Sequence, residues 1–96
     1  AYGAPTQRFG AVLEGAVRAF RAARARLVQR LVPRGARILD VGCGRGLFLR
    51  LLRERGYQVR GTELSEATRR NAYADVPIDA GELTAASYPP GSFDLI

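Results

Sequence analysis

The sequence contains no lysine and no histidine, and it has a single cysteine, Cys43. Without lysine it cannot carry the phosphate-binding loop of nucleoside triphosphatases, in which a lysine reaches the terminal phosphates. Without histidine, metal binding and catalysis by a Ser-His or Cys-His pair have no local support. One cysteine cannot form an internal disulfide. Its place among glycines favours a small loop filler over a nucleophile, and a cytoplasmic location.

Long apolar runs are also absent, so we expect no membrane span and no secretory signal peptide. Methionine is missing too, even at position 1, and the last residues, SFDLI, are typical of the start of a strand. We therefore expect the chain to be a fragment of a longer polypeptide. All fifteen basic residues are arginine, which we interpret as codon bias in a GC-rich bacterial genome.

Positive charge is concentrated near the N-terminus, where eight arginines precede residue 38 against one acidic residue, Glu14. A basic segment of this kind can bind nucleic acid. However, no aromatic residues alternate with the arginines to stack on bases. The favoured interpretation is a solvent-exposed helix face, and a nucleic-acid partner is disfavoured.

Residues 1–35 are predicted to form an N-terminal helical segment. Gly3 and Pro5 predict a loose start, Gly10 and Gly15 predict a late or broken helix, and Pro33 ends it. Between residues 9 and 32, apolar residues recur at spacings of three and four, which predicts one buried face. That face comprises Leu13, Ala16, Val17, Phe20, Ala23, Leu27, Val28 and Leu31.

Residues 36–96 alternate between strand-like and helix-like patterns, which predicts a layered α/β fold with a parallel sheet. Ser65 is the expected N-cap of the helix at 66–74. The predicted elements are a strand at 38–41, a helix at 47–55, a strand at 57–63, a helix at 66–74, a strand at 76–78, a loop at 80–91 and a strand at 93–96.

A glycine-rich loop joins the first strand to the helix, in the stretch RILDVGCGRG at residues 37–46. The free backbone N–H groups of such a loop and the adjoining helix N-terminus favour ligand binding. The dinucleotide fingerprint requires a third glycine or alanine where this chain has Leu47. This spacing disfavours an NAD(P)-dependent oxidoreductase, which stays an alternative. A non-catalytic module that binds through the basic N-terminal helix is another.

Asp40 followed by glycines at 42, 44 and 46 resembles the first motif of class I, Rossmann-like S-adenosylmethionine-dependent methyltransferases. A second segment, GELTAASYPPGSFD at 81–94, is similar to the segment of that family usually written GDAEDLPFPDGSFD. Glu82 stands where the family has aspartate. Both motifs occur in order and in register, and the resemblance covers residues 37–96.

The resemblance implies S-adenosylmethionine as cofactor and assigns residues to each part of it. The methionine end is assigned Asp40, Gly42, Cys43, Gly44 and Gly46, whereas the ribose and adenine are assigned Glu63, Leu64, Glu82 and Leu83. Glu63 would accept hydrogen bonds from the ribose hydroxyls. Glu82 would accept one from the adenine amino group, with Leu64 packed on the ring and the Leu83 backbone at its edge.

The resemblance further implies transfer of a methyl group to an unidentified, small-molecule acceptor. Alignment of donor and acceptor would supply most of the catalysis, and no catalytic residue is named. The family fold has seven strands, of which about four are expected here. We therefore expect the isolated chain to be inactive and to expose an unpaired sheet edge, which favours a homodimer. Tyr73 is assigned to packing and Asp94 to support of the fold.

Overall fold

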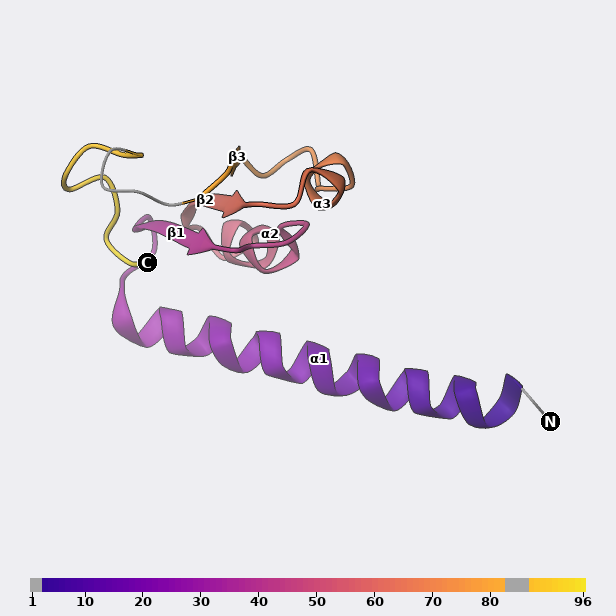
Figure 1. The fold of residues 1–96 in the computed structure, drawn as a ribbon. Coiled ribbons are helices and arrows are strands. Elements are labelled where there is room, and N and C mark those ends of the chain that lie inside the picture. Colours follow the sequence, from indigo (N-terminus) through magenta and orange to yellow (C-terminus); the bar gives the residue numbers. More distant parts are fainter. Residues whose placement is uncertain (1–2, 83–86) are drawn as a thin grey trace.

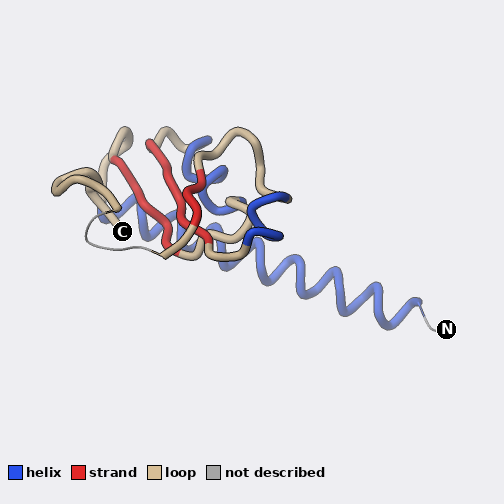
Figure 2. The backbone as a smooth tube through the Cα atoms, turned by 45° about the horizontal axis from the view of Figure 1, so that its top comes forward, coloured by secondary structure: helices blue, strands red, loops and turns tan. Residues whose placement is uncertain are grey.

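The computed structural model describes residues 3–82 and 87–96, with side chains from residue 10 onward in the first helix. The elements follow in the order α1 (Gly3–Leu31), β1 (Arg37–Val41), α2 (Leu47–Glu54), β2 (Gln58–Glu63), α3 (Glu66–Arg70) and β3 (Ile78–Ala80). The strands form a parallel sheet in the order β1-β2-β3, and they lie side by side in Figure 2. The predicted α/β fold, a partial Rossmann-like sheet behind an N-terminal helix, is confirmed.

Strand β3, helix α3 and the predicted fourth strand differ from the prediction by more than one residue. Strand β3 begins at Ile78, directly after Pro77, which has no N–H to donate to a strand ladder, and Val76 is buried before it. Helix α3 ends at Arg70, where hydrogen bonds three residues apart tighten its last turn. Instead of the predicted fourth strand, the described residues give one parallel bridge between Leu95 and Ile38.

The prediction of a loose start and a late helix is wrong for residues 3–8, because α1 begins at Gly3 and is continuous to Leu31; residues 1–2 lie outside the described residues. Pro5 lies in the first turn, where a helix needs no N–H donor, so proline is tolerated there. Gly10 and Gly15 lie within the helix without breaking it. None of the described helices is both long and apolar enough to cross a membrane.

The prediction of one buried face along the whole of α1 is also wrong. The N-terminal part of the helix projects beyond the sheet, giving overall dimensions of 56 × 32 × 20 Å (Figure 1). Leu13, Phe20 and Leu27 on the predicted stripe are 53%, 65% and 54% exposed, whereas Ala25 and Val28 are buried. Of the predicted stripe only Val28 is buried, and the face that packs in the core combines Val28 with Ala25, which lies off the stripe.

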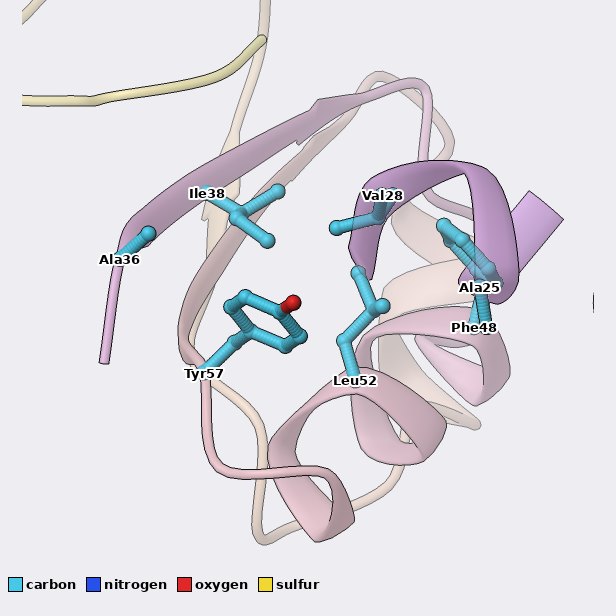
Figure 3. Packing of buried hydrophobic residues seen from close by; sticks show 7 residues of the cluster. All are labelled: Ala25, Val28, Ala36, Ile38, Phe48, Leu52 and Tyr57. Atoms are coloured by element: carbon cyan, nitrogen blue, oxygen red, sulfur yellow. The ribbon is translucent and has the colours of Figure 1, made fainter. Parts of the chain in front are cut away.

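The core forms where α1 and α2 pack together on one face of the sheet. Ala25 and Val28 of α1 meet Leu52 of α2, with Ile38 and Tyr57 completing the cluster on the sheet side (Figure 3). The Tyr57 hydroxyl donates to the Val32 carbonyl over 3.0 Å, which ties the end of α1 to the start of β2. These contacts fix the C-terminal turns of α1 against the rest of the chain.

Residues 87–96 are held to the sheet by two carboxylates. Asp94 accepts from the Arg37 backbone N–H over 2.8 Å and pairs with the guanidinium of the same residue. Asp79 of β3 accepts from the Tyr88 hydroxyl and pairs with Arg60 of β2. The end of the second sequence motif therefore supports the fold, as assigned to Asp94.

Candidate functional site

The glycine loop, residues 42–46, leaves β1 and enters α2. Gly42 and Gly44 have φ angles of +70° and +63°, a backbone conformation that side chains with a Cβ rarely adopt. A Cβ built at either glycine would meet no protein atom within 4 Å. These two glycines therefore expose bare backbone beside open space, an arrangement suited to the close approach of a ligand.

Gly46 has a different role from the other two. It precedes the first residue of α2, its φ is +90°, and a Cβ there would lie 2.7 Å from the Val76 side chain. Gly46 thus allows the start of α2 to pack against the segment before β3. Although Gly46 was assigned to the ligand, it faces the side chains of Val76 and Ile78 and not open space.

Glu63, at the end of β2, is hydrogen-bonded directly to the glycine loop. Its Oε1 accepts from the Gly44 N–H and its Oε2 from the Ser65 N–H, both over 2.9 Å. These donors, Ser65 first, hold the pKa of the Glu63 carboxyl below its usual value. Ser65 also caps α3 as predicted, because its hydroxyl accepts from the Thr68 N–H. Each carboxylate oxygen has two acceptor positions, so Glu63 keeps capacity for further donors.

A cavity of about 460 Å³ lies on one side of the loop, and we call it the aspartate cavity. Asp40 lines it together with Gly42, Gly44 and Tyr73. Burial raises the pKa of the Asp40 carboxyl above its usual value, and the positive charge of Arg24 partly opposes this rise. The guanidiniums of Arg45 and Arg50 lie 5.2 Å and 4.9 Å from the Tyr73 ring centre, so Tyr73 packs as predicted, and it also forms part of this wall.

A second cavity, of about 320 Å³, shares Val41 and Gly42 with the first, and we call it the glutamate cavity. Glu63, Leu64 and Glu82 line it, and Leu64 is 63% exposed. Leu83, the remaining predicted residue, lies outside the described residues. The structure therefore gathers three of the four residues assigned to the ribose and adenine around one hollow.

Cys43 faces the protein at the base of the loop. Its backbone N–H donates to the Thr62 carbonyl over 2.9 Å. Burial, with the nearby charges of Asp40 and Glu63, raises the pKa of the Cys43 thiol to about 11. A thiol of this kind is a poor nucleophile near neutral pH, in agreement with the interpretation of Cys43 as a loop filler.

Sequence reasoning missed Gly61 and two arginines of α1. A Cβ on Gly61 would lie 2.5 Å from the Cys43 sulfur and 2.6 Å from Leu49. A glycine inside a strand often marks such a close approach, so the signal was present. Arg21 and Arg24 line the aspartate cavity, but they are distant from the loop in sequence, and no local pattern indicates this.

A larger and more open hollow, of about 750 Å³, lies between α1 and α2. Leu13 and Val17 form one wall, and Leu47 and Leu51 form the other. None of the residues of the glycine loop lines it. We therefore place the candidate ligand site at the two cavities beside the loop.

Comparison with known proteins agrees with this geometry. A family model described as "Methyltransferase domain" matches residues 13–96. A ubiquinone biosynthesis O-methyltransferase from Ralstonia nicotianae is 37% identical over 70 residues, which are 65% of this chain and 29% of that protein. The chain thus spans less than a third of the length of the curated relative that it matches.

Two solved structures are similar in both fold and sequence. An amino pentose methyltransferase from Micromonospora echinaspora, solved with S-adenosylmethionine bound, is 33% identical with a TM-score of 0.58; the match covers 74% of this chain and 34% of that one. An S-adenosylmethionine-dependent methyltransferase from Mesorhizobium loti is 34% identical with a TM-score of 0.54, covering 71% and 35%. The chain therefore belongs to the methyltransferase domain family, and its resemblance to the class I S-adenosylmethionine-dependent methyltransferases is confirmed.

Proposed function

We propose that this chain is the cofactor-binding part of an S-adenosylmethionine-dependent methyltransferase. One observation carries the proposal: Gly42 and Gly44 present bare backbone to open space, between one hollow that holds Glu63 and another that holds Asp40. Cavities of this size are typical of small-molecule sites. S-adenosylmethionine has a ribose and adenine at one end and an amino acid at the other, so it suits two hollows joined at a glycine turn.

Each hollow suits one end of the cofactor. In the glutamate cavity, the free acceptor positions of Glu63 would receive the ribose hydroxyls. Leu64 would cover the adenine, and Glu82 would accept from its amino group, with the Leu83 backbone at the ring edge. In the aspartate cavity, Asp40 would face the positively charged amine of the methionine end, and the bare backbone at Gly42, Cys43 and Gly44 would let that chain approach closely.

The bound cofactor would supply a methyl group on a sulfonium, which is already a strong leaving group. The residues of this chain bind and orient the cofactor, so their contribution to the reaction is positioning. We name no catalytic residue. The relatives that carry specific names act on small molecules, and we propose a small-molecule acceptor here.

Binding of S-adenosylhomocysteine, measured by isothermal titration calorimetry, tests the proposal. We expect binding to the wild type and a loss of at least about tenfold in affinity for Gly44→Ala, because the added methyl group enters the open space. Gly35→Ala is the matched control, since Gly35 also has a positive φ, +86°, and open space beside it, but lies between α1 and β1. Binding of NAD with no response to S-adenosylhomocysteine would favour the oxidoreductase alternative instead.

We also propose how the chain is divided and how it associates. Residues 1–35 would form a helical segment before a cofactor-binding domain at 36–96. Beside β1 the described residues give a single bridge at Leu95, and we propose that this edge pairs with a second copy of the chain. Light scattering coupled to size-exclusion chromatography is expected to show a dimer, and a monomer would contradict this arrangement. A separate assay of the purified chain is expected to show no methyl transfer activity.

A further inference from the structure

Arg69 of α3 reaches back to the end of β2, the strand that the helix directly follows (Figure 1). Its Nη1 donates to the carbonyl of Glu63 and, over 2.8 Å, to the carbonyl of Leu64. The Arg69 side chain is half-buried, whereas the adjacent Arg70 is exposed and pairs with Glu66 of the same helix. Of these two neighbouring arginines, Arg69 is therefore the one that contacts residues of the glutamate cavity.

The two hydrogen bonds to one nitrogen fix the course of the backbone at Leu64. Successive carbonyls of an extended strand point to opposite sides, so two of them meet one donor where the chain turns. The sheet already places the Glu63 carbonyl, because it accepts from the Gly81 N–H over 3.2 Å. Arg69 adds a constraint on the next peptide group, and the direction of the Leu64 side chain depends on that group.

Leu64 relies on this constraint because packing holds it weakly. Its side chain is 63% exposed, although it lines the glutamate cavity. The direction in which it points therefore follows from the backbone that carries it. Arg69 also acts on Glu63, since its positive charge adds to the backbone donors, Ser65 first, that lower the pKa of the Glu63 carboxyl.

We propose that Arg69 is a positioning residue for the adenosine end of the cofactor, because it holds the turn after Glu63 so that Leu64 meets the adenine ring. This inference rests on the proposed function, since it takes Glu63 and Leu64 as the contacts of the ribose and adenine. Arg69 does not line the glutamate cavity itself, so it acts through the two residues whose carbonyls it binds.

Replacement of Arg69 tests this role. Arg69→Met removes the N–H donors and keeps an unbranched side chain. S-adenosylhomocysteine and adenosine are titrated separately into the folded wild type and variant by calorimetry, with folding checked by circular dichroism. We expect Arg69→Met to weaken both ligands by a similar factor of at least about fivefold, because they share the adenosine end. Arg69→Lys keeps a charged donor and should recover most of the affinity.

Arg70→Met is the matched control, because it removes the same charge from the next position of α3, where the side chain is exposed. It should change either affinity by less than about twofold. Proton NMR of the chain saturated with S-adenosylhomocysteine gives a second measurement. We expect nuclear Overhauser effects between the Leu64 methyl groups and the adenine protons in the wild type and Arg70→Met, and their loss in Arg69→Met. A role in stability alone would leave this contact unchanged in a folded variant.

Three outcomes would overturn the proposal. The first is unchanged affinity in Arg69→Met, and the second is an equal loss in Arg70→Met, which would indicate charge alone. The third is a loss for S-adenosylhomocysteine with adenosine unaffected, which would place the effect at the methionine end. If Arg69→Met does not fold, Arg69→Gln replaces it with the same expected direction, because one amide replaces the charged guanidinium.

Failure of the proposed function has a separate signature. If the wild type binds neither S-adenosylhomocysteine nor adenosine, both the proposed function and the role of Arg69 are overturned. If the wild type binds them and Arg69→Met binds them equally well, the role of Arg69 alone is overturned.

Discussion

The Gly44 amide donates to Oε1 of Glu63 over 2.9 Å, and this bond joins the glycine loop of β1 to the end of β2. The other oxygen of Glu63 binds the Ser65 amide, so one carboxylate organises two turns. The same carboxylate is the proposed partner of the ribose. The proposed contact with the cofactor and the order of the loop therefore involve the same side chain.

Replacement of Glu63 should affect both properties. Glu63→Gln keeps one acceptor oxygen but turns an amide toward the second N–H donor, so we expect lower stability to urea and at least about tenfold weaker S-adenosylhomocysteine binding. Glu66→Gln is the control, because Glu66 forms an exposed pair with Arg70 one turn away. Unchanged affinity in Glu63→Gln would remove Glu63 from the proposed site.

The stability difference between Glu63→Gln and wild type should depend on pH. The pKa of Glu63 is lowered in the folded state, so its charged form stabilises the fold above the usual value of 4.5. This contribution is lost as the pH falls through the lowered folded value. Urea unfolding curves of the two proteins should therefore differ at neutral pH and converge in acid. A difference that persists in acid would point to packing instead of charge.

Asp40→Asn should stabilise the empty protein while weakening the cofactor site. The pKa of Asp40 is raised by burial, so the folded state carries a penalty for ionising it. That penalty is absent below the usual value of 3.8 and is complete once the pH exceeds the raised folded value. Thermal melts should show Asp40→Asn to be the more stable protein at neutral pH, with no difference in strong acid. Calorimetry should show weaker S-adenosylhomocysteine binding, and equal binding would contradict the assigned role.

Gly61→Ala should destabilise the fold by overpacking against Cys43 of the glycine loop. The new Cβ would lie 2.5 Å from the Cys43 sulfur, 2.6 Å from Leu49 and 2.9 Å from the Cys43 Cβ. Overpacking of this kind costs about 1 to 3 kcal/mol, which chemical denaturation measures. Cys43→Ala in the same chain removes the sulfur contact and should recover part of the loss. Strictly additive effects of the two changes would show that the residues do not meet.

Cys43 should react slowly with iodoacetamide. A thiol whose pKa is about 11 is almost wholly protonated at about pH 8, and the thiolate is the reactive form. Mass spectrometry of the folded chain should show labelling much slower than that of glutathione, with rapid labelling restored in urea. Fast labelling of the folded protein would mean that the loop opens readily.

The site was predictable where its residues are close in sequence. Gly42 and Gly44 follow a strand directly, and Glu63 ends the next one, so their motif and register indicated a shared sheet edge. Gly46 was assigned to the ligand because the motif contains it, but only its 2.7 Å approach to Val76 separates its role from that of Gly44. A spacing rule cannot distinguish a glycine that faces a ligand from one that faces a side chain.

The sequence by itself determined the parallel α/β fold, the glycine turn and the acid at the end of β2, because strand alternation, backbone freedom and caps are local properties. Only the tertiary structure decided how α1 is used. Its apolar spacing predicts a buried stripe, yet only Val28 of that stripe is buried. The face that packs in the core also uses Ala25, which lies off the stripe and whose small side chain allows close contact. That arrangement places Arg21 and Arg24 at the cavity, a consequence of packing between segments distant in sequence.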